Sequence, residues 1–203
     1  MEPAQLWAFV VFSLVGSFTP GPNNTIATAT AANFGFRAAL PHILGVPFGF
    51  STMLALGSLG AVGLLLSLPT AAGAIKWAGI AYLVYLGWLL MRATRATSHH
   101  APRTPSARPL TFLESALFQY ANPKAWMLAA ATAGTYMSGR DVATRAALIC
   151  TVFSATCMAS LMVWAWMGAA LREWLRPGRR RWWFNAAMGL SLAATALWMA
   201  VTT

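Results

Sequence analysis

Charged residues are scarce in this chain of 203 residues, and acidic residues are the scarcest, with 4 Asp and Glu against 14 Lys and Arg. Charged residues make up 9% of the sequence, whereas a soluble domain carries about 25%. The stretch between Arg37 and Lys76 has no charged residue and is long enough for a membrane-spanning helix of about 20 residues. The composition therefore places the chain among membrane proteins, as one compact helical bundle.

The shortage of acidic residues leaves a net charge of +10, which in a soluble protein would suggest a nucleic-acid partner. Here the arginines cluster between hydrophobic runs, where basic residues orient a membrane protein. They do not form a soluble basic face with interleaved aromatic residues. We therefore expect no nucleic acid as a partner.

The chain has two cysteines, Cys150 and Cys157, in one predicted helix. At a rise of about 1.5 Å per residue they lie about 10 Å apart, too far for a disulfide, which argues against a thiol oxidoreductase. The other candidate metal ligands are scattered, and His99–His100 stands in a basic loop without nearby carboxylates. We expect no metal site, no cofactor and no enzyme activity, although a metal-ion permease on a related bundle remains the alternative function.

Hydrophobic segments predict six transmembrane helices in a single domain over residues 1–203, and the first lacks the basic start of a cleavable signal peptide. The predicted ranges are 6–33, 38–67, 74–91, 111–136, 143–171 and 182–201. The first helix is interrupted at Pro20–Pro22 and the fourth at Asn122–Lys124. Proline removes a backbone donor and blocks the helix, and freed backbone groups are costly in hydrocarbon unless protein or water satisfies them. Such breaks are typical of transporter sites.

Each half of the chain holds three of these helices, on either side of a basic loop over residues 93–109. The first helix of each half is broken, and similar tetrapeptides open the second, Arg37–Leu40 and Arg145–Leu148. Because three is an odd number, the two halves, 4–92 and 110–203, enter the membrane in opposite directions. This all-α arrangement predicts an inverted repeat whose broken helices meet near the bilayer midplane, where such transporters bind substrate.

The basic residues also predict the orientation in the membrane. Ten of them lie in the loops after the first, third and fifth helices, namely Arg37, Arg92, Arg95, Arg103, Arg108, Arg172, Arg176, Arg179, Arg180 and Arg181. The opposite side holds three, Lys76, Arg140 and Arg145. Because loops rich in Lys and Arg remain in the cytoplasm, we expect both termini outside.

The two breaks offer the groups that a free amino acid needs. The N-terminus of a half-helix presents N–H groups and partial positive charge to a carboxylate, and freed carbonyls suit an ammonium group. Asparagine adds donors and acceptors without a buried charge. The candidate substrate-binding residues are those of the two breaks: Thr19, Pro20, Gly21, Pro22, Asn23, Asn24, Asn122, Pro123 and Lys124. The structural alternative is that each asparagine only caps its broken helix.

Four ionisable residues are candidates for further roles. Lys124, the one basic residue well inside a predicted span, can pair with a substrate carboxylate, titrate during proton exchange, or bind a freed carbonyl. His42 titrates in a range that suits proton coupling, although a hydrogen-bonded histidine near a helix end fits as well. Glu114 fits an interfacial cap or a coupling residue, and Arg37 an orientation anchor or a gate.

Three motifs, in this order, resemble the lysine exporter family, also called the homoserine/threonine resistance transporter family. They are Thr19–Asn24 with Asn33–Arg37 and Gly45, then Gly79–Trp88, then Asn122–Trp126. The run Asn33–Leu44 is most similar to the cysteine/O-acetylserine exporter subgroup. The fourth helix departs from the family pattern, with Gly134–Tyr136 where many members have Pro-Gln-Phe.

The resemblance implies a secondary exporter of small neutral amino acids, such as cysteine, O-acetylserine, threonine or homoserine, in the bacterial inner membrane. It implies alternating access driven by proton exchange, and it places the substrate region on the residues of the two breaks. The expected partners are the amino-acid substrate, protons and membrane lipid. The sequence leaves open which amino acid is exported and whether the chain forms a homo-oligomer.

Overall fold

A computed structural model of the chain describes residues 1–58, 69–92, 108–137, 142–175 and 178–202. Every regular element in these ranges is a helix, which confirms the all-α prediction for them. The helices are α1 (Pro3–Phe18), α2 (Pro22–Phe34), α3 (Phe36–Ser58), α5 (Pro69–Arg92), α6 (Phe112–Ala121), α7 (Pro123–Tyr136), α8 (Val142–Leu171) and α9 (Arg179–Thr202).

Four of the described helices, α3, α5, α8 and α9, are long and apolar enough to cross a membrane. The pair α1 and α2 is a fifth candidate span, bent by 53° at its break. The pair α6 and α7, which carries the polar residues Gln119, Asn122 and Lys124, is not among these candidates. The described ranges therefore support five spans, and the sixth remains a prediction.

Some helix ends differ from the prediction. α5 begins at Pro69 rather than near Ala74, because proline fits the first turn of a helix. α9 begins at Arg179, so part of the basic stretch predicted as a loop is helical, in keeping with the good helix propensity of arginine. The predicted end of the second helix, near Ser67, and the histidine pair at 99–100 lie outside the described residues.

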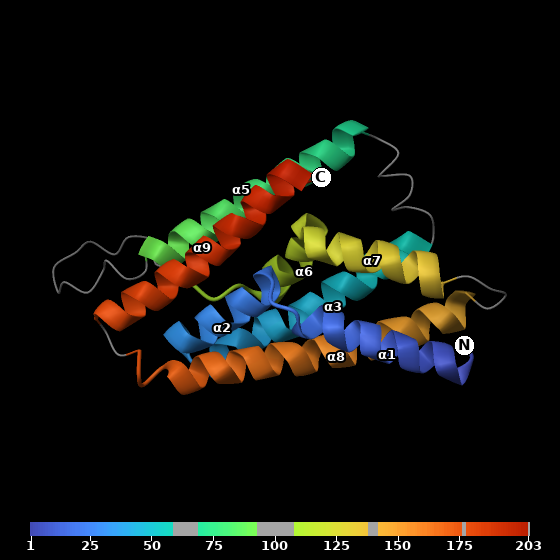
Figure 1. Cartoon of the computed structure of the whole chain (residues 1–203), viewed down its shortest axis with the longest axis horizontal. Helices are drawn as coiled ribbons and strands as arrows, with labels where there is room; N and C mark the ends of the chain where they lie inside the picture. The colour runs from blue at the N-terminus through green and yellow to red at the C-terminus, as the bar shows by residue number, and fades with distance from the viewer. Residues whose placement is uncertain (59–68, 93–107, 138–141, 176–177, 203) are drawn as a thin grey trace.

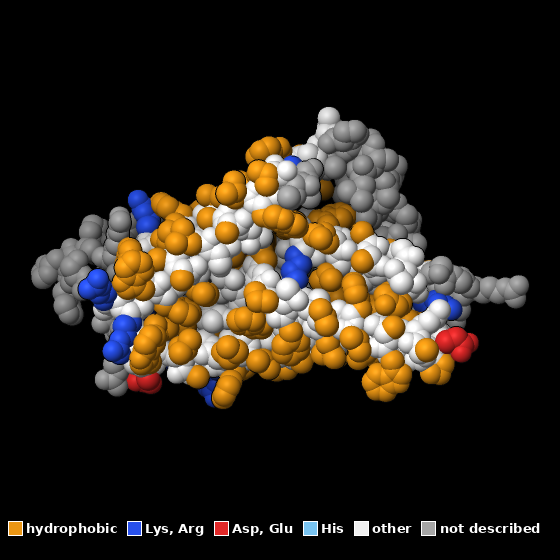
Figure 2. All heavy atoms as spheres, viewed as in Figure 1, with side chains coloured by type: hydrophobic (Ala, Val, Ile, Leu, Met, Phe, Trp, Pro, Cys, Tyr) orange, Lys and Arg blue, Asp and Glu red, His pale blue; other side chains and the backbone are white. Residues whose placement is uncertain are grey.

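The helices form an elongated bundle (Figure 1). α5 and α9 lie side by side, and α1, α2, α3 and α8 form the body of the bundle. At one end of the molecule α2 and α8 stop and α3 and α9 begin, and both chain termini lie away from this end. Hydrophobic side chains cover the middle of the face shown in Figure 2, while Lys and Arg side chains gather at that end. This distribution is typical of a membrane protein with one basic face.

Proline sets the position of each break. α1 ends at Phe18, Gly21 is fully extended with φ −176° and ψ −179°, and Pro22 is the first residue of α2. Asn122, between α6 and α7, is extended with φ −95° and ψ 112°, the conformation favoured by a residue that precedes proline. Both predicted breaks are therefore present, each with a helix end on either side.

Close contacts join the broken helices of each half to the long helices of the other. A Cβ placed on Gly49 of α3 would lie 2.2 Å from the Ala116 oxygen of α6. A Cβ on Gly168 of α8 would lie 2.2 Å from the Thr28 oxygen of α2. Glycine thus lets these backbones touch, so α3 lies directly against α6 and α8 directly against α2.

Candidate functional site

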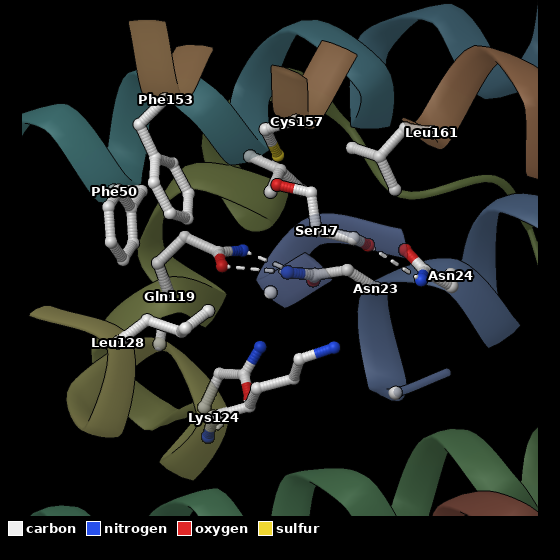
Figure 3. Close-up of a pocket in the computed structure, with 15 residues that line it drawn as sticks. Ser17, Asn23, Asn24, Phe50, Gln119, Lys124, Leu128, Phe153, Cys157 and Leu161 are labelled. Atoms are coloured by element: carbon white, nitrogen blue, oxygen red, sulfur yellow. Dashed lines mark hydrogen bonds between the residues drawn. The ribbon is translucent and has the colours of Figure 1, made fainter. Parts of the chain in front are cut away.

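A cavity of about 40 Å³ lies between the two breaks. Five of the nine predicted residues line it: Gly21, Asn23, Asn24, Asn122 and Lys124. The four others do not line it; Thr19 and Pro20 are exposed, and Pro22 and Pro123 are buried within the breaks. The prolines therefore shape the site, while the polar residues beside them face its interior (Figure 3).

Protein groups satisfy the freed carbonyls at the C-terminal end of α1. Asn24 Nδ2 donates to the oxygens of Ser17 and Thr19, at 3.0 Å each. Ser160 Oγ of α8 also donates to the Ser17 oxygen, at 2.9 Å. Lys124 Nζ, reaching across from α7, donates to the Thr19 oxygen. Each half of the chain thus helps to close the break in α1 and α2, which offsets the cost of leaving carbonyls unpaired in an apolar surrounding.

The N-terminus of α2 is left open by comparison. Its N-cap residue is Gly21, which has no side chain to accept a hydrogen bond from the first turn. The two asparagines that follow Pro22 are engaged elsewhere, Asn24 with α1 and Asn23 with α6. The positive end of the α2 dipole therefore lies at the cavity. None of the side chains described at this cap accepts a hydrogen bond from its first turn.

Ser17 adds a hydroxyl to the cavity. Its side chain is 8% exposed and lines the cavity, and the buried Oγ has no hydrogen-bond partner. Figure 3 shows Ser17 between Cys157 and Asn23. Because buried hydroxyls are nearly always hydrogen-bonded, an unpartnered one in a cavity is a position where a ligand oxygen can be bound.

Asn23 and Gln119 pair their side-chain amides across the two halves of the chain. Asn23 Nδ2 donates to Gln119 Oε1 at 2.9 Å, and Gln119 Nε2 donates to Asn23 Oδ1 at 3.3 Å. Gln119 Nε2 also donates to the Ser115 oxygen one turn earlier, at 2.8 Å. This amide pair lines the cavity, as Figure 3 shows, and joins α2 to α6.

His42 of α3 is buried and contacts both α2 and α6. Its Nε2 is 3.1 Å from the Asn23 oxygen, and its Nδ1 is 3.0 Å from Ser115 Oγ. His42 does not line the cavity but contacts a residue that does. Both ring nitrogens have partners, as expected for a hydrogen-bonded histidine near the start of α3.

Asn122 is a helix cap, as the structural alternative predicted for the asparagines. Its Oδ1 accepts a hydrogen bond from the Lys124 N–H at the start of α7, at 3.1 Å. Asn23 and Asn24 do not cap α2, since their side chains bind Gln119 and the α1 carbonyls. The three asparagines therefore have three different roles, which their common position at a proline break did not reveal.

Glu114 and Arg37 lie away from the cavity. Glu114 completes a capping box with Thr111 at the start of α6 and forms an ion pair with Arg108, with Arg108 Nη1 2.8 Å from Glu114 Oε2. The hydrogen bonds and charge of Glu114 raise the pKa of the Arg108 guanidinium above its ordinary value. Arg37 is exposed in the first turn of α3, beside the basic end of the molecule. The cap expected at Glu114 is present, and nothing in this geometry connects either residue to the cavity.

A Glu114→Gln variant tests whether Glu114 is only a cap. Glutamine can also complete a capping box, and an exposed ion pair contributes about 0–1 kcal/mol. We therefore expect transport rates within about twofold of wild type and an unchanged pH profile. A loss of the response to a proton gradient in flux measurements would instead assign the coupling proton to Glu114.

A second polar cluster, which the sequence analysis did not find, fixes the far end of α2. Asn33 Nδ2 donates to Asn185 Oδ1 of α9 at 2.8 Å, and Arg181 Nε donates to Asn33 Oδ1 at 2.9 Å. Asn33 and Asn185 are buried. Since this cluster anchors α2 to the basic end, α2 is held at both of its termini.

Among the cavity residues with a hydroxyl, amide or thiol side chain, the sequence analysis missed Gln119, Ser17 and Cys157. Gln119 lies one turn before the second break, where an amide in an apolar helix is a usable signal. Ser17 and Cys157 are small residues in apolar helices and carry no such signal. Among the described residues, no three His, Cys, Asp or Glu side chains lie close enough to hold a metal ion.

Comparisons with known proteins agree with the resemblance found in the sequence. Residues 14–203 match the family described as LysE type translocator. The cysteine/O-acetylserine efflux proteins of Escherichia coli (strain K12) and Shigella sonnei (strain Ss046) are each 34% identical over 124 residues. The aligned segment spans 61% of this chain and 61% of each relative. No solved structure matches the chain significantly.

Proposed function

Since the chain belongs to the LysE type translocator family, we propose that it exports a small neutral amino acid, or a derivative such as O-acetylserine, across the bacterial inner membrane. The apolar helices support an integral membrane protein. The names of the relatives, cysteine/O-acetylserine efflux protein, support the substrate class. The proposed mechanism is alternating access driven by proton antiport.

The observation that carries this proposal is that the N-terminus of α2 and Ser17 line the same cavity. The α2 N-terminus lacks a side-chain cap, and the buried Ser17 Oγ lacks a partner. Together they offer N–H donors, a hydroxyl and the positive end of a helix dipole, which is the set of groups that binds a carboxylate. Every free amino acid carries that carboxylate.

The rest of the cavity supports a small, uncharged substrate side chain. Its walls include Phe50 and Phe153, whose rings stack at 3.9 Å, together with Leu161 and Cys157. None of the described residues that line it is acidic. A basic substrate side chain would therefore enter without a carboxylate partner, which is unfavourable in a buried site.

The size of the cavity supports a change of conformation during transport. A cavity needs at least about 10–15 Å³ to hold one water molecule, so about 40 Å³ accommodates a few waters and not an amino acid. Substrate entry then requires the helices around the breaks to separate on one side. Such a separation of helices around a fixed site is the movement that alternating access proposes.

The reciprocal packing of the two halves, in which a long helix of each half contacts the broken helix of the other, supports an inverted repeat. The long helix α3 packs on α6, with Gly45 and Gly49 at the contact. In the other half α8 packs on α1 and α2, with Ser160 bonded to the Ser17 oxygen and Gly168 against Thr28. Each half thus packs the long helix that follows its broken helix, α3 or α8, on the broken helix of the other half. The basic end of the molecule supports a cytoplasmic location for that end, with both termini outside.

For proton coupling, the geometry favours His42 over Arg37 and Glu114. A neutral His42 can donate from Nε2 to the Asn23 oxygen and accept at Nδ1 from Ser115 Oγ. A protonated His42 can donate from both nitrogens, and Ser115 Oγ can then turn its proton to the Thr111 oxygen, 2.8 Å away. Because one hydroxyl rotation accommodates the extra proton, His42 can change its charge state while every polar atom keeps a partner.

The proposal is tested by efflux from vesicles that contain the purified protein and are preloaded with labelled O-acetylserine, threonine or homoserine. We expect saturable efflux above that of protein-free vesicles, faster with a proton gradient directed against the substrate and slower with a protonophore. Absence of saturable efflux for every neutral amino acid would contradict the proposed function. Saturable efflux at the same rate with and without the protonophore would contradict only the proposed proton coupling.

A further inference from the structure

The ammonium group of Lys124 occupies the carbonyl end of the first break. Lys124 starts on α7, in the second half of the chain, and its Nζ donates to the Thr19 oxygen at the C-terminal end of α1. Figure 3 shows its side chain extending toward the α1–α2 break. The last carbonyls of a helix carry the negative end of its dipole and attract cations. This contact is therefore a cation site built from backbone.

The backbone of the break leaves room for this lysine. A Cβ placed on Gly21 would lie 3.0 Å from Lys124 Cδ and 3.3 Å from Nζ. Gly21 is extended, a conformation open to any residue, so its backbone conformation does not require glycine. The need for glycine here comes from the path of the Lys124 side chain.

Lys124 has no acidic partner in the cavity. The acidic residues that the structure describes lie elsewhere: Glu2 precedes α1, Glu114 caps α6, and Glu173 follows α8. The other ionisable group that lines the cavity is the Cys157 thiol of α8. The charge of Lys124 is therefore balanced mainly by the carbonyl end of α1.

The ammonium group of an amino acid needs the same partners. It has the same charge and the same three donors as the lysine ammonium. The Thr19 oxygen lies beside the cavity, at the end of the Lys124 side chain that lines it. Two ammonium groups cannot share the Thr19 oxygen without strong repulsion. Substrate binding at both ends of the break therefore requires Lys124 to leave.

We propose that Lys124 is an internal cation that fills the substrate-ammonium subsite of the empty transporter and yields this subsite to the amino acid. The inference rests on the proposed export function. After substrate release, an unfilled subsite would leave the negative end of the α1 dipole without a cation, with Asn24 Nδ2 as the remaining donor to the Thr19 oxygen, which is unfavourable. Lys124 removes that cost, so the empty protein can return to the loading side.

Two flux measurements on one preparation test this role. Net efflux into substrate-free buffer includes the return of the empty transporter, whereas exchange of internal for external substrate does not. For Lys124→Met we expect the ratio of exchange to net efflux to rise about tenfold or more. The variant lacks one charge-assisted hydrogen bond in the returning state, so the return of the empty transporter slows by about that factor. Lys76→Met, which removes a lysine beside Trp77 on α5, is the matched control and should keep the wild-type ratio.

The alternative outcomes are distinct. If Lys124→Met lowers net efflux and exchange by the same factor, Lys124 binds the substrate itself and the inference is wrong. If the ratio and both rates stay at wild-type values, Lys124 has no role in the cycle and the inference is also wrong. A wild type that shows neither flux overturns the proposed function and this inference with it.

A second variant keeps the test independent of folding defects caused by removing the lysine. Gly21→Ala retains Lys124 and its charge but places a methyl group against its Cδ. We expect the same rise in the exchange-to-efflux ratio, in smaller measure, and a cavity-lining role unrelated to Lys124 would leave the ratio unchanged. Lys124→Arg, which keeps a cation, should retain more net efflux than Lys124→Met.

Discussion

A Gly49→Ala variant should lose about 2 kcal/mol of its free energy of unfolding, because the new methyl group cannot fit between α3 and α6. Its Cβ would lie 2.2 Å from the Ala116 oxygen and 2.7 Å from the Ala116 Cα. These are backbone atoms, which cannot turn aside as a side chain can. The two helices would have to separate, and the polar contacts between α2, α3 and α6 would lengthen with them. The midpoint of thermal unfolding in detergent, followed by tryptophan fluorescence, measures this loss.

Gly134→Ala is the matched control, since a Cβ on this glycine of α7 would meet nothing within 4 Å. Alanine is more favourable than glycine in a helix by about 1 kcal/mol, so this variant should unfold at the same or a higher temperature. The two substitutions are chemically identical and differ only in what the methyl group meets. Equal midpoints for both variants would show that α3 and α6 do not touch as closely as the structure indicates.

The sequence predicted the breaks because proline acts locally. Pro20 and Pro22 stop α1 and start α2, and Pro123 holds Asn122 in an extended conformation, wherever the rest of the chain lies. Composition likewise predicted the helical, membrane-embedded class. Helix ends without such a local signal were less accurate, as at Arg179, where a run of arginines continues into α9.

The partners of the polar side chains could not be predicted, because they depend on how α2, α6 and α8 pack. Asn23, Asn24 and Asn122 all lie within two residues of a proline at a break. Yet one pairs with Gln119, one binds the α1 carbonyls and one caps α7. The contact between Lys124 and Thr19 joins residues 105 positions apart. The sequence offered this carbonyl contact only as one of three roles for Lys124.

The helix contacts at the site are of two kinds, packed helix interfaces and single polar contacts. α8 holds α1 and α2 through Ser160 and Gly168, and α3 holds α6 through Gly45 and Gly49. The contacts of Lys124 with Thr19 and of Asn23 with Gln119 cross between these two groups of helices. α3 and α8 also pack directly across these groups, with the Phe50 and Phe153 rings stacked at 3.9 Å and Ser51 Oγ 3.1 Å from Ser154 Oγ. An opening at the site would therefore have to disturb this packed interface as well as the single polar contacts.

A Ser17→Ala variant should bind the exported amino acid about 10- to 100-fold more weakly and yet be no less stable than wild type. A hydrogen bond to a charged group contributes about 1.5–3 kcal/mol, which corresponds to that range of affinity. The unfolding midpoint should stay the same or rise, because the Oγ that is removed has no partner to lose. The Ser17 backbone oxygen, which binds Asn24 and Ser160, is retained. The KM for saturable efflux and the thermal midpoint, measured on the same protein, separate these two effects.

Thr132→Val supplies the comparison that isolates the cavity. Thr132 Oγ1 of α7 is also buried without a hydrogen-bond partner, but Thr132 does not line the cavity. Valine removes this hydroxyl with little change of shape, so stability should again hold while the KM remains that of wild type. If both variants raise the KM alike, or if Ser17→Ala leaves it unchanged, the carboxylate does not bind at Ser17. A raised KM for Ser17→Ala alone locates the substrate carboxylate in the cavity beside Ser17, because both residues carry an unpartnered hydroxyl and only Ser17 lines the cavity.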